Sequence, residues 1–216
     1  MDRAALSAGS WNLLANFYRL QDRPSDALVA IEKVAELSGG GSDRLRFAQA
    51  DLLIDLGDYA RAEEIAATLE EPTYARLLRG RVALDQNDPK RALEYFEQGI
   101  RSWPNNAGAR YLAGRAALEL GDTSRAMSEF RESMRIDNMS TPASESLARL
   151  HYEMGDYNDA LQIARMAQRR LDVNLPNVLT VVARSFTALG QYDDARQVVE
   201  ILLARPDTRL TGAEEL

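Results

Sequence analysis

Few side chains in this sequence of 216 residues could carry out covalent chemistry. The chain has no cysteine and a single histidine, His151. Thiolate nucleophiles, disulfides, cysteine-bound zinc and iron–sulfur clusters are therefore excluded, as is any site with several histidine ligands. A serine–histidine–aspartate triad would depend on His151 alone. We expect a protein that is not an enzyme and that has no catalytic residue, cofactor or metal.

The charge of the chain also limits its partners. Against 26 basic residues stand 33 acidic ones, a net charge of −7 with a pI near 4.9. This sign disfavours binding to nucleic-acid phosphates over a broad face and docking on anionic lipid. No apolar stretch approaches the ~20 residues that span a bilayer, and the first residues lack the pattern of a signal peptide. We expect no nucleic-acid partner and no direct membrane insertion. The bias toward arginine over lysine resembles bacterial proteins, so we expect the bacterial cytoplasm or periplasm.

Turn signals recur along the chain at nearly regular intervals. They are centred on Asp22, Gly57, Asn87, Gly121, Gly155 and Gly190, at intervals of 35, 30, 34, 34 and 35 residues. Glycine, asparagine and aspartate tolerate the left-handed backbone found where one helix stops and the next starts. The sequence is therefore an array of six repeats, the second of which is about one helical turn short.

Two columns of small residues accompany these turns. Five residues after each turn centre lie Ala27, Ala62, Ala92, Ala126, Ala160 and Ala195, and seven residues before it lie Ala15, Ala50, Gly80, Gly114, Ala148 and Ala183. Small side chains let two antiparallel helices approach closely where they cross, while larger residues around them fill the layer.

The segments between the turns have apolar residues at helical spacing, and none alternates with a period of two. They predict twelve helices and no strand. The predicted helices are 8–21, 24–37, 43–56, 59–70, 73–86, 89–102, 107–120, 123–136, 141–154, 157–171, 176–189 and 192–204. Without strands, no phosphate-binding loop between a strand and a helix is expected.

This pattern resembles the tetratricopeptide repeat, which has a small residue at repeat position 8, glycine at 15, an aromatic residue at 17 and alanine at 20. The family's tryptophan at position 4 is present only as Trp11, so the repeats are degenerate. The resemblance implies an all-α, right-handed solenoid of six antiparallel helix pairs in a single domain over residues 1–216. Its repeats would span 8–42, 43–72, 73–106, 107–140, 141–175 and 176–208, with 209–216 starting a truncated further helix. We therefore expect a longer parent array.

The resemblance also implies a concave groove lined by repeat positions 2, 5, 9, 12 and 13. Position 9 holds four successive arginines, which suggests an acidic peptide or helix as partner because guanidinium groups bind carboxylates in a forked geometry. The predicted groove residues are Asn12, Asn16, Arg19, Phe47, Asp51, Leu77, Arg81, Tyr111, Arg115, Leu118, Arg149, Tyr152, Arg184 and Thr187.

A second interpretation of the arginines stays open. Arg81–Asp85, Arg115–Glu119 and Arg149–Glu153 are spaced i,i+4, so each arginine could pair within its own helix and be no more than a solvated charge. Arg184 has alanine at the matching position and lacks such a partner. The groove also lacks the clamp with which some family members hold a C-terminal carboxylate, since Ala48, Tyr74 and Leu78 stand where polar groups would be needed.

His151 and several aromatic residues are expected in the core. In the family pattern His151 falls at position 11, which faces the neighbouring helix, so it is interpreted as a packed histidine. The aromatic residues at positions 17 and 24 are interpreted as packing between helices. They are Tyr59, Tyr157, Tyr192, Phe96 and Phe130.

The sequence thus predicts a protein-interaction scaffold that binds a peptide segment or helix in its groove, within a larger bacterial protein. Envelope systems such as pilus assembly and polysaccharide export are settings that the family suggests. Two alternatives remain: self-assembly through the repeat ends, and recruitment of substrate for an enzyme domain outside this chain.

Overall fold

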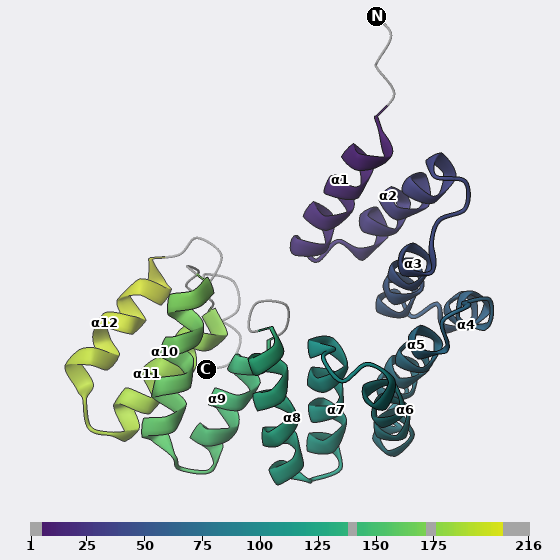
Figure 1. Cartoon of the computed structure of the whole chain (residues 1–216). Coiled ribbons are helices and arrows are strands. Elements are labelled where there is room, and N and C mark those ends of the chain that lie inside the picture. The colour runs from purple at the N-terminus through teal and green to yellow at the C-terminus, as the bar shows by residue number, and fades with distance from the viewer. Residues whose placement is uncertain (1–5, 138–141, 172–175, 205–216) are drawn as a thin grey trace, which may run out of the picture. The chain divides into compact units, whose positions relative to one another are not determined.

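The computed structural model describes residues 6–137, 142–171 and 176–204, which form twelve α-helices and no strand (Figure 1). The first six are α1 (Ala8–Leu20), α2 (Pro24–Leu37), α3 (Asp43–Asp55), α4 (Tyr59–Ala67), α5 (Pro72–Asp85) and α6 (Pro89–Ser102). The others are α7 (Ala107–Glu119), α8 (Thr123–Ile136), α9 (Ala143–Glu153), α10 (Tyr157–Leu171), α11 (Pro176–Ala188) and α12 (Tyr192–Leu203). The all-α prediction is confirmed, and most boundaries agree within two residues.

The chain divides into two compact units, residues 1–104 and 105–216. In the first unit, α1 pairs with α2, α3 with α4 and α5 with α6, and successive pairs touch through α2 on α3 and α4 on α5. In the second unit, the pairs are α7–α8, α9–α10 and α11–α12, joined through α8 on α9 and α10 on α11. Each unit is therefore a stack of three antiparallel helix pairs.

Left-handed backbone closes each helix pair at the predicted residues. Asp22 and Asn87 have φ values of 52° and 60°, and the four glycines at the equivalent turns have values between 74° and 84°. The following residue then returns its N–H to the preceding helix, as when Asp88 donates to the carbonyl of Ala83 at 2.8 Å. Asp88 also caps α6, because its carboxylate accepts the N–H of Arg91.

Both columns of small residues are buried, as predicted. The glycines show how tight the helix crossings are. A Cβ atom added to Gly80 would lie 2.6 Å from Cε1 of Phe96, and one added to Gly114 would lie 2.6 Å from Cε1 of Phe130. Both rings are fully buried, so neither can move into solvent.

The aromatic predictions hold for most residues and fail for one. Phe96 and Phe130 are completely buried, and Tyr59 and Tyr157 are half-buried. Tyr192 was expected in the core but is 69% exposed. Its helix, α12, packs extensively only on α11 within the described chain, so this tyrosine has no further layer to pack against.

The second repeat is shortened in its second helix. α4 has nine residues and ends at Ala67, not at 70 as predicted. The Thr68 hydroxyl donates to the carbonyl of Ile65, and Glu71 adopts the extended backbone that a residue before proline prefers. The linker is held by Asp43, which accepts the N–H of Glu71 at 2.8 Å and a hydrogen bond from Arg46. These donors lower the pKa of the Asp43 carboxyl.

The glycine-rich segment at 38–42 lies between α2 and α3, and Gly39, Gly40 and Gly41 all have positive φ. The proposed further helix at 209–216 and the residues before Leu6 lie outside the described residues. None of the described helices combines the length and apolar character that crossing a bilayer requires.

Candidate functional site

In the first unit, the predicted groove residue Arg81 is held by two carboxylates. Its guanidinium, on α5, donates to Asp51 and, at 2.7 Å, to Asp55, both on α3. Arg19 of α1 adds a third contact, 3.7 Å from the Asp51 carboxylate. Burial works against the charge of Arg81, but the two carboxylates outweigh it and raise the pKa of Arg81 above its ordinary value.

This network corrects the expected pairing of Arg81. Spacing along α5 left a pair with Asp85 open as one interpretation, whereas the guanidinium reaches across to the preceding repeat. The reason is geometric: the side chain is only 21% exposed, and it lies between α5 and the two acidic residues of α3. Arg81 therefore links α3 to α5, and both of its terminal nitrogens, Nη1 and Nη2, already donate to carboxylates.

The remaining predicted residues of this unit divide between surface and interior. Asn12, Asn16 and Arg19 are exposed on α1, while Leu77 is buried. Phe47 is half-buried with its ring centroid 5.1 Å from that of Tyr74.

Sequence reasoning missed a pocket beside this aromatic pair. The Tyr74 ring meets Trp103 edge-on at 6.3 Å, and both line a pocket of about 470 Å³. Its other lining residues are Glu71, Thr73, Arg76 and Ser102. The available signal in the sequence was the tryptophan directly before Pro104; in the structure, Trp103 is the C-cap of α6 and is exposed.

In the second unit, the predicted arginines are exposed. Arg115 lies on α7 and Arg149 on α9, and each has a carboxylate one turn further along its own helix. These contacts are long: 3.9 Å from Arg115 to Glu119 and 3.8 Å from Arg149 to Glu153. Surface pairs of this kind contribute little to stability, about 0–1 kcal/mol.

Arg184 on α11 differs from these two arginines. It is exposed, and no described carboxylate lies within ion-pair distance of it. Of the two interpretations, pairing within the helix therefore describes Arg115 and Arg149, whereas Arg184 has no ion-pair partner among the described residues.

The predicted apolar residues of this unit are half-buried beside the arginines. Tyr111 packs on Phe130 with ring centroids 5.7 Å apart, and Tyr152 packs on Tyr157 at 5.5 Å. Tyr111 and Leu118 rest on the same hydrophobic cluster. Thr187 is exposed, but its hydroxyl donates to the carbonyl of Ala183 one turn back. Thr187 is thus bonded within its own helix, whereas the arginines make only long ion-pair contacts or, for Arg184, none with a described carboxylate.

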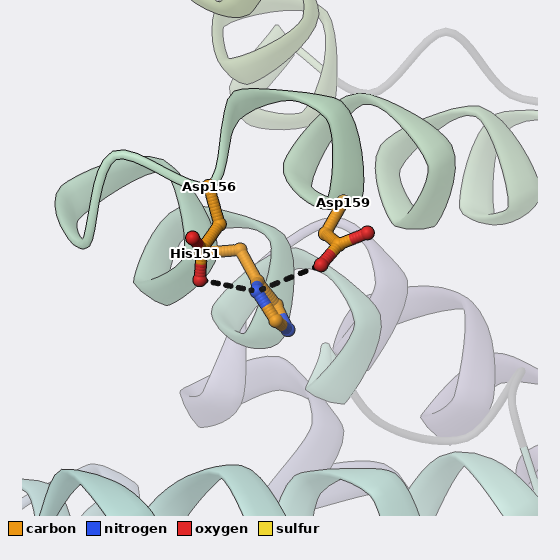
Figure 2. A group of neighbouring side chains, drawn as sticks. All are labelled: His151, Asp156 and Asp159. Carbon is orange, nitrogen blue, oxygen red and sulfur yellow. Dashed lines mark ion pairs between the residues drawn. The ribbon is translucent and has the colours of Figure 1, made fainter.

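His151 is buried, as predicted, but two carboxylates face it that the sequence analysis did not connect with it. Figure 2 shows the imidazole with its Nδ1 atom toward Asp156 and Asp159. Nδ1 lies 3.5 Å from Oδ2 of Asp156 and 4.0 Å from Oδ2 of Asp159. On the other side of the ring, Nε2 lies 3.4 Å from the guanidinium of Arg131. The His-x₄-Asp-x₂-Asp spacing was the available signal.

Family models of the tetratricopeptide repeat match residues 44–68 and 77–138. The helix pairs described above and the two columns of small residues continue the same repeat on either side of these segments. Residues 44–68 and 77–138 are therefore tetratricopeptide repeats, and the other described helix pairs have the same architecture. Proteins built from such stacked repeats offer extended surfaces that bind other proteins or peptides, which supports a non-catalytic scaffold role.

Solved structures of other tetratricopeptide-repeat chains have the same fold. TTC0263, a thermophilic protein of this family from Thermus thermophilus, is 17% identical, with a TM-score of 0.67 over 85% of this chain and 99% of its own. PilW, a type IV pilus biogenesis factor, is 19% identical, with a TM-score of 0.67 over 95% and 94%. Pseudomonas aeruginosa PilF is 16% identical, with a TM-score of 0.64 over 90% of each chain.

At these identities the likeness shows the fold alone. No curated protein sequence matches this chain.

Proposed function

We propose that this protein is a non-catalytic scaffold whose second unit binds an acidic segment of a partner protein. The observation that carries the proposal is the set of exposed arginines on the first helices of three consecutive pairs. Arg115, Arg149 and Arg184 occupy the same repeat position on α7, α9 and α11. Their spacing of one repeat matches a ligand that follows the stack of helices.

The weak intrahelical contacts of these arginines favour ligand binding. A carboxylate of the partner that makes a forked hydrogen bond would replace a surface contact of 3.8–3.9 Å with a shorter, charge-assisted one. Arg184 has no ion pair with a described carboxylate, so it would not have to give up such a contact to bind the ligand. Tyr111, Leu118 and Tyr152 supply apolar surface next to the charges, and such anchors provide most of the affinity in protein interfaces. The arginines would set orientation and the rate of encounter.

The first unit is not expected to bind the acidic groups. Arg81 is already paired with Asp51 and Asp55, so its guanidinium would have to give up these contacts before it could bind a carboxylate of a ligand.

The test compares two double variants with the same change in charge. Arg149→Glu with Arg184→Glu reverses two charges on the proposed surface. Arg135→Glu with Arg196→Glu reverses two exposed charges on second helices of the same unit. Binding of fluorescent peptides rich in glutamate, tyrosine and leucine is measured by anisotropy at low and moderate salt, with glutamine versions of the peptides as reference.

We expect the first double variant to bind at least tenfold more weakly and the second to bind within about threefold of the unchanged chain, since interface charges act mainly at short range. Unchanged affinity of the first variant with an intact helical circular dichroism spectrum would refute the proposal. PilW is described as a pilus biogenesis factor, so components of pilus assembly are a reasonable first set of proteins in which to search for the natural partner.

A second candidate function is self-assembly, and one observation favours it. The first and last described helices both expose large apolar side chains, including Leu13, Phe17 and Leu20 on α1 and Tyr192 and Leu203 on α12. A second copy of the chain could cover either surface.

A further inference from the structure

We propose that His151, Asp156 and Asp159 form a binding site for a divalent transition-metal ion. The three ligand atoms, Nδ1 of the histidine and one carboxylate oxygen of each aspartate, all lie within 4.8 Å of one another. In a tetrahedral zinc site, ligands about 2.0–2.2 Å from the ion lie roughly 3.4 Å apart. Small rotations of the two exposed aspartates would bring their oxygens to that spacing.

The buried histidine is the second observation that points to a ligand. Its side chain is 8% exposed, and Nδ1 has no hydrogen-bond partner among the described residues. Buried polar atoms are almost always satisfied, so this nitrogen requires an explanation. It is directed toward the gap between the two carboxylates (Figure 2), where a cation would complete its coordination.

Comparison of the repeats separates this arrangement from ordinary helix capping. An aspartate at the Asp156 position is expected in any case, because Asp58, Asp88 and Asp122 cap the corresponding helices. Helix capping does not explain the presence of His151. The equivalent residue of the next repeat is Phe186, although that repeat keeps an aspartate, Asp194, at the position of Asp159.

The ligand set selects the kind of ion. One imidazole and two carboxylates suit zinc, cobalt or nickel better than calcium or magnesium, which prefer ligand sets made only of oxygen. With three protein ligands, further coordination positions are left to water or to a group of a binding partner.

Arg131 opposes binding and gives the site a second test. A metal on Nδ1 places the imidazole proton on Nε2, which then faces the donors of the Arg131 guanidinium. Arg131 is exposed on α8 and can turn into solvent, but its charge lowers the affinity for a cation. The side-chain oxygen of glutamine at this position could instead accept a hydrogen bond from Nε2–H, as the partners of metal-bound histidines do.

Binding would join the end of α9 to the first turn of α10. His151 lies in the last turn of α9, and Asp159 lies in the first turn of α10. An ion held by both would resist their separation, so the bound chain should unfold at a higher temperature.

The test uses the full chain without an affinity tag, titrated with Zn²⁺ and Co²⁺ by calorimetry and by the visible absorption of Co²⁺. His151→Phe reproduces the next repeat, and Asp159→Asn removes an exposed ligand. Asp194→Asn is the matched control at the same repeat position. Because His151 is the chain's one histidine, its ring signals in NMR spectra report directly on coordination.

We expect one ion per chain, at least tenfold weaker binding in His151→Phe and Asp159→Asn, unchanged binding in Asp194→Asn and tighter binding in Arg131→Gln. Zn²⁺ should shift the ring signals of His151. Binding that is equal in all variants, or that leaves those signals unmoved, would mean that surface carboxylates alone hold the ion. That result, or an absence of binding by a folded chain, would overturn the proposal.

Discussion

At the scale of single residues, the main electrostatic feature of the first unit is the contact of Arg81 with Asp51 and Asp55. The neighbouring Arg79, two residues earlier on α5, makes a bidentate pair with Glu63 that is more exposed. Ion pairs at the surface contribute little, whereas breaking a buried one leaves unpaired charge in a poorly solvated place. Arg81 and Arg79 therefore allow a direct comparison of an arginine–carboxylate contact that is largely buried with one that is more exposed.

We predict that Arg81→Gln lowers the free energy of unfolding by about 1–3 kcal/mol, because Asp51 and Asp55 lose their shared counter-charge. Arg79→Gln should cost less than about 1 kcal/mol. Urea unfolding of both variants, followed by circular dichroism, measures the difference. Equal losses in the two variants would show that the Arg81 network contributes no more than a surface pair.

The arginines also show what could be predicted from the sequence and what could not. Spacing within one helix identified the contacts of Arg115 and Arg149 because i,i+4 geometry is local. It failed for Arg81, whose partners lie 30 and 26 residues earlier in the chain. Their proximity depends on how α3 and α5 stack, which no local pattern encodes.

At the scale of helices, the small residue at a helix crossing matches the side chain opposite it. The two repeats with glycine at this position, Gly80 and Gly114, carry phenylalanine sixteen residues later. The four repeats with alanine carry a smaller side chain at the later position: Ile31, Ala66, Ala164 and Val199. Sequence reasoning recognised the column of small residues and so predicted the pairing of helices. It did not recognise that the choice between glycine and alanine depends on the ring opposite.

We predict that Gly114→Ala destabilises the chain by about 1–3 kcal/mol, since the new methyl group would overlap the buried Phe130 ring. Gly9→Ala is the control, because in that exposed place the nearest atom would be 3.7 Å away and the better helix propensity of alanine should be neutral or favourable. Thermal unfolding of both variants measures the effect.

The double variant Gly114→Ala with Phe130→Ala reproduces the alanine pairs of the second and fifth repeats. It should lose less stability than the sum of the two single variants, because the added methyl group occupies part of the space that the ring leaves. Strict additivity would show that the two positions do not compensate each other.

The sequence predicted most helix ends, because glycine, asparagine or aspartate marks the turns within the helix pairs. The end of α4 is the exception. The repeat pattern extended it to 70, but Pro72 requires an extended residue before it, and Thr68 ends the helix with its own hydroxyl. The proline was visible in the sequence. The contacts that fix the linker run from Asp43 to Glu71 and from Arg46 to Thr68. They join residues 22 to 28 positions apart, so the sequence pattern could not predict them.

At the scale of the whole molecule, the apolar surfaces of the first and last described helices decide between monomer and assembly. On α1, the exposed Leu13, Phe17 and Leu20 are spaced i, i+4 and i+7, which places them in one stripe, and Leu20 is 85% exposed. Tyr192 and Leu203 are exposed on α12. A contact between α1 of one copy and α12 of another would leave both outer surfaces free again, so chains would grow, whereas a contact between two α1 stripes would stop at a dimer.

Self-assembly as the second candidate function predicts that the mass of the unchanged chain rises with concentration in sedimentation velocity, and that Leu13→Glu with Leu20→Glu abolishes the rise. Val29→Glu serves as control, because Val29 is also exposed and apolar but lies on α2, outside the stripe. Continued growth beyond two copies favours contact of α1 with α12, and Leu203→Glu should then suppress it equally. If the mass ends at that of a dimer and Leu203→Glu has no effect, two α1 stripes face each other. A mass that stays constant over the whole concentration range would rule out assembly through these helices and leave peptide binding as the function of the repeats.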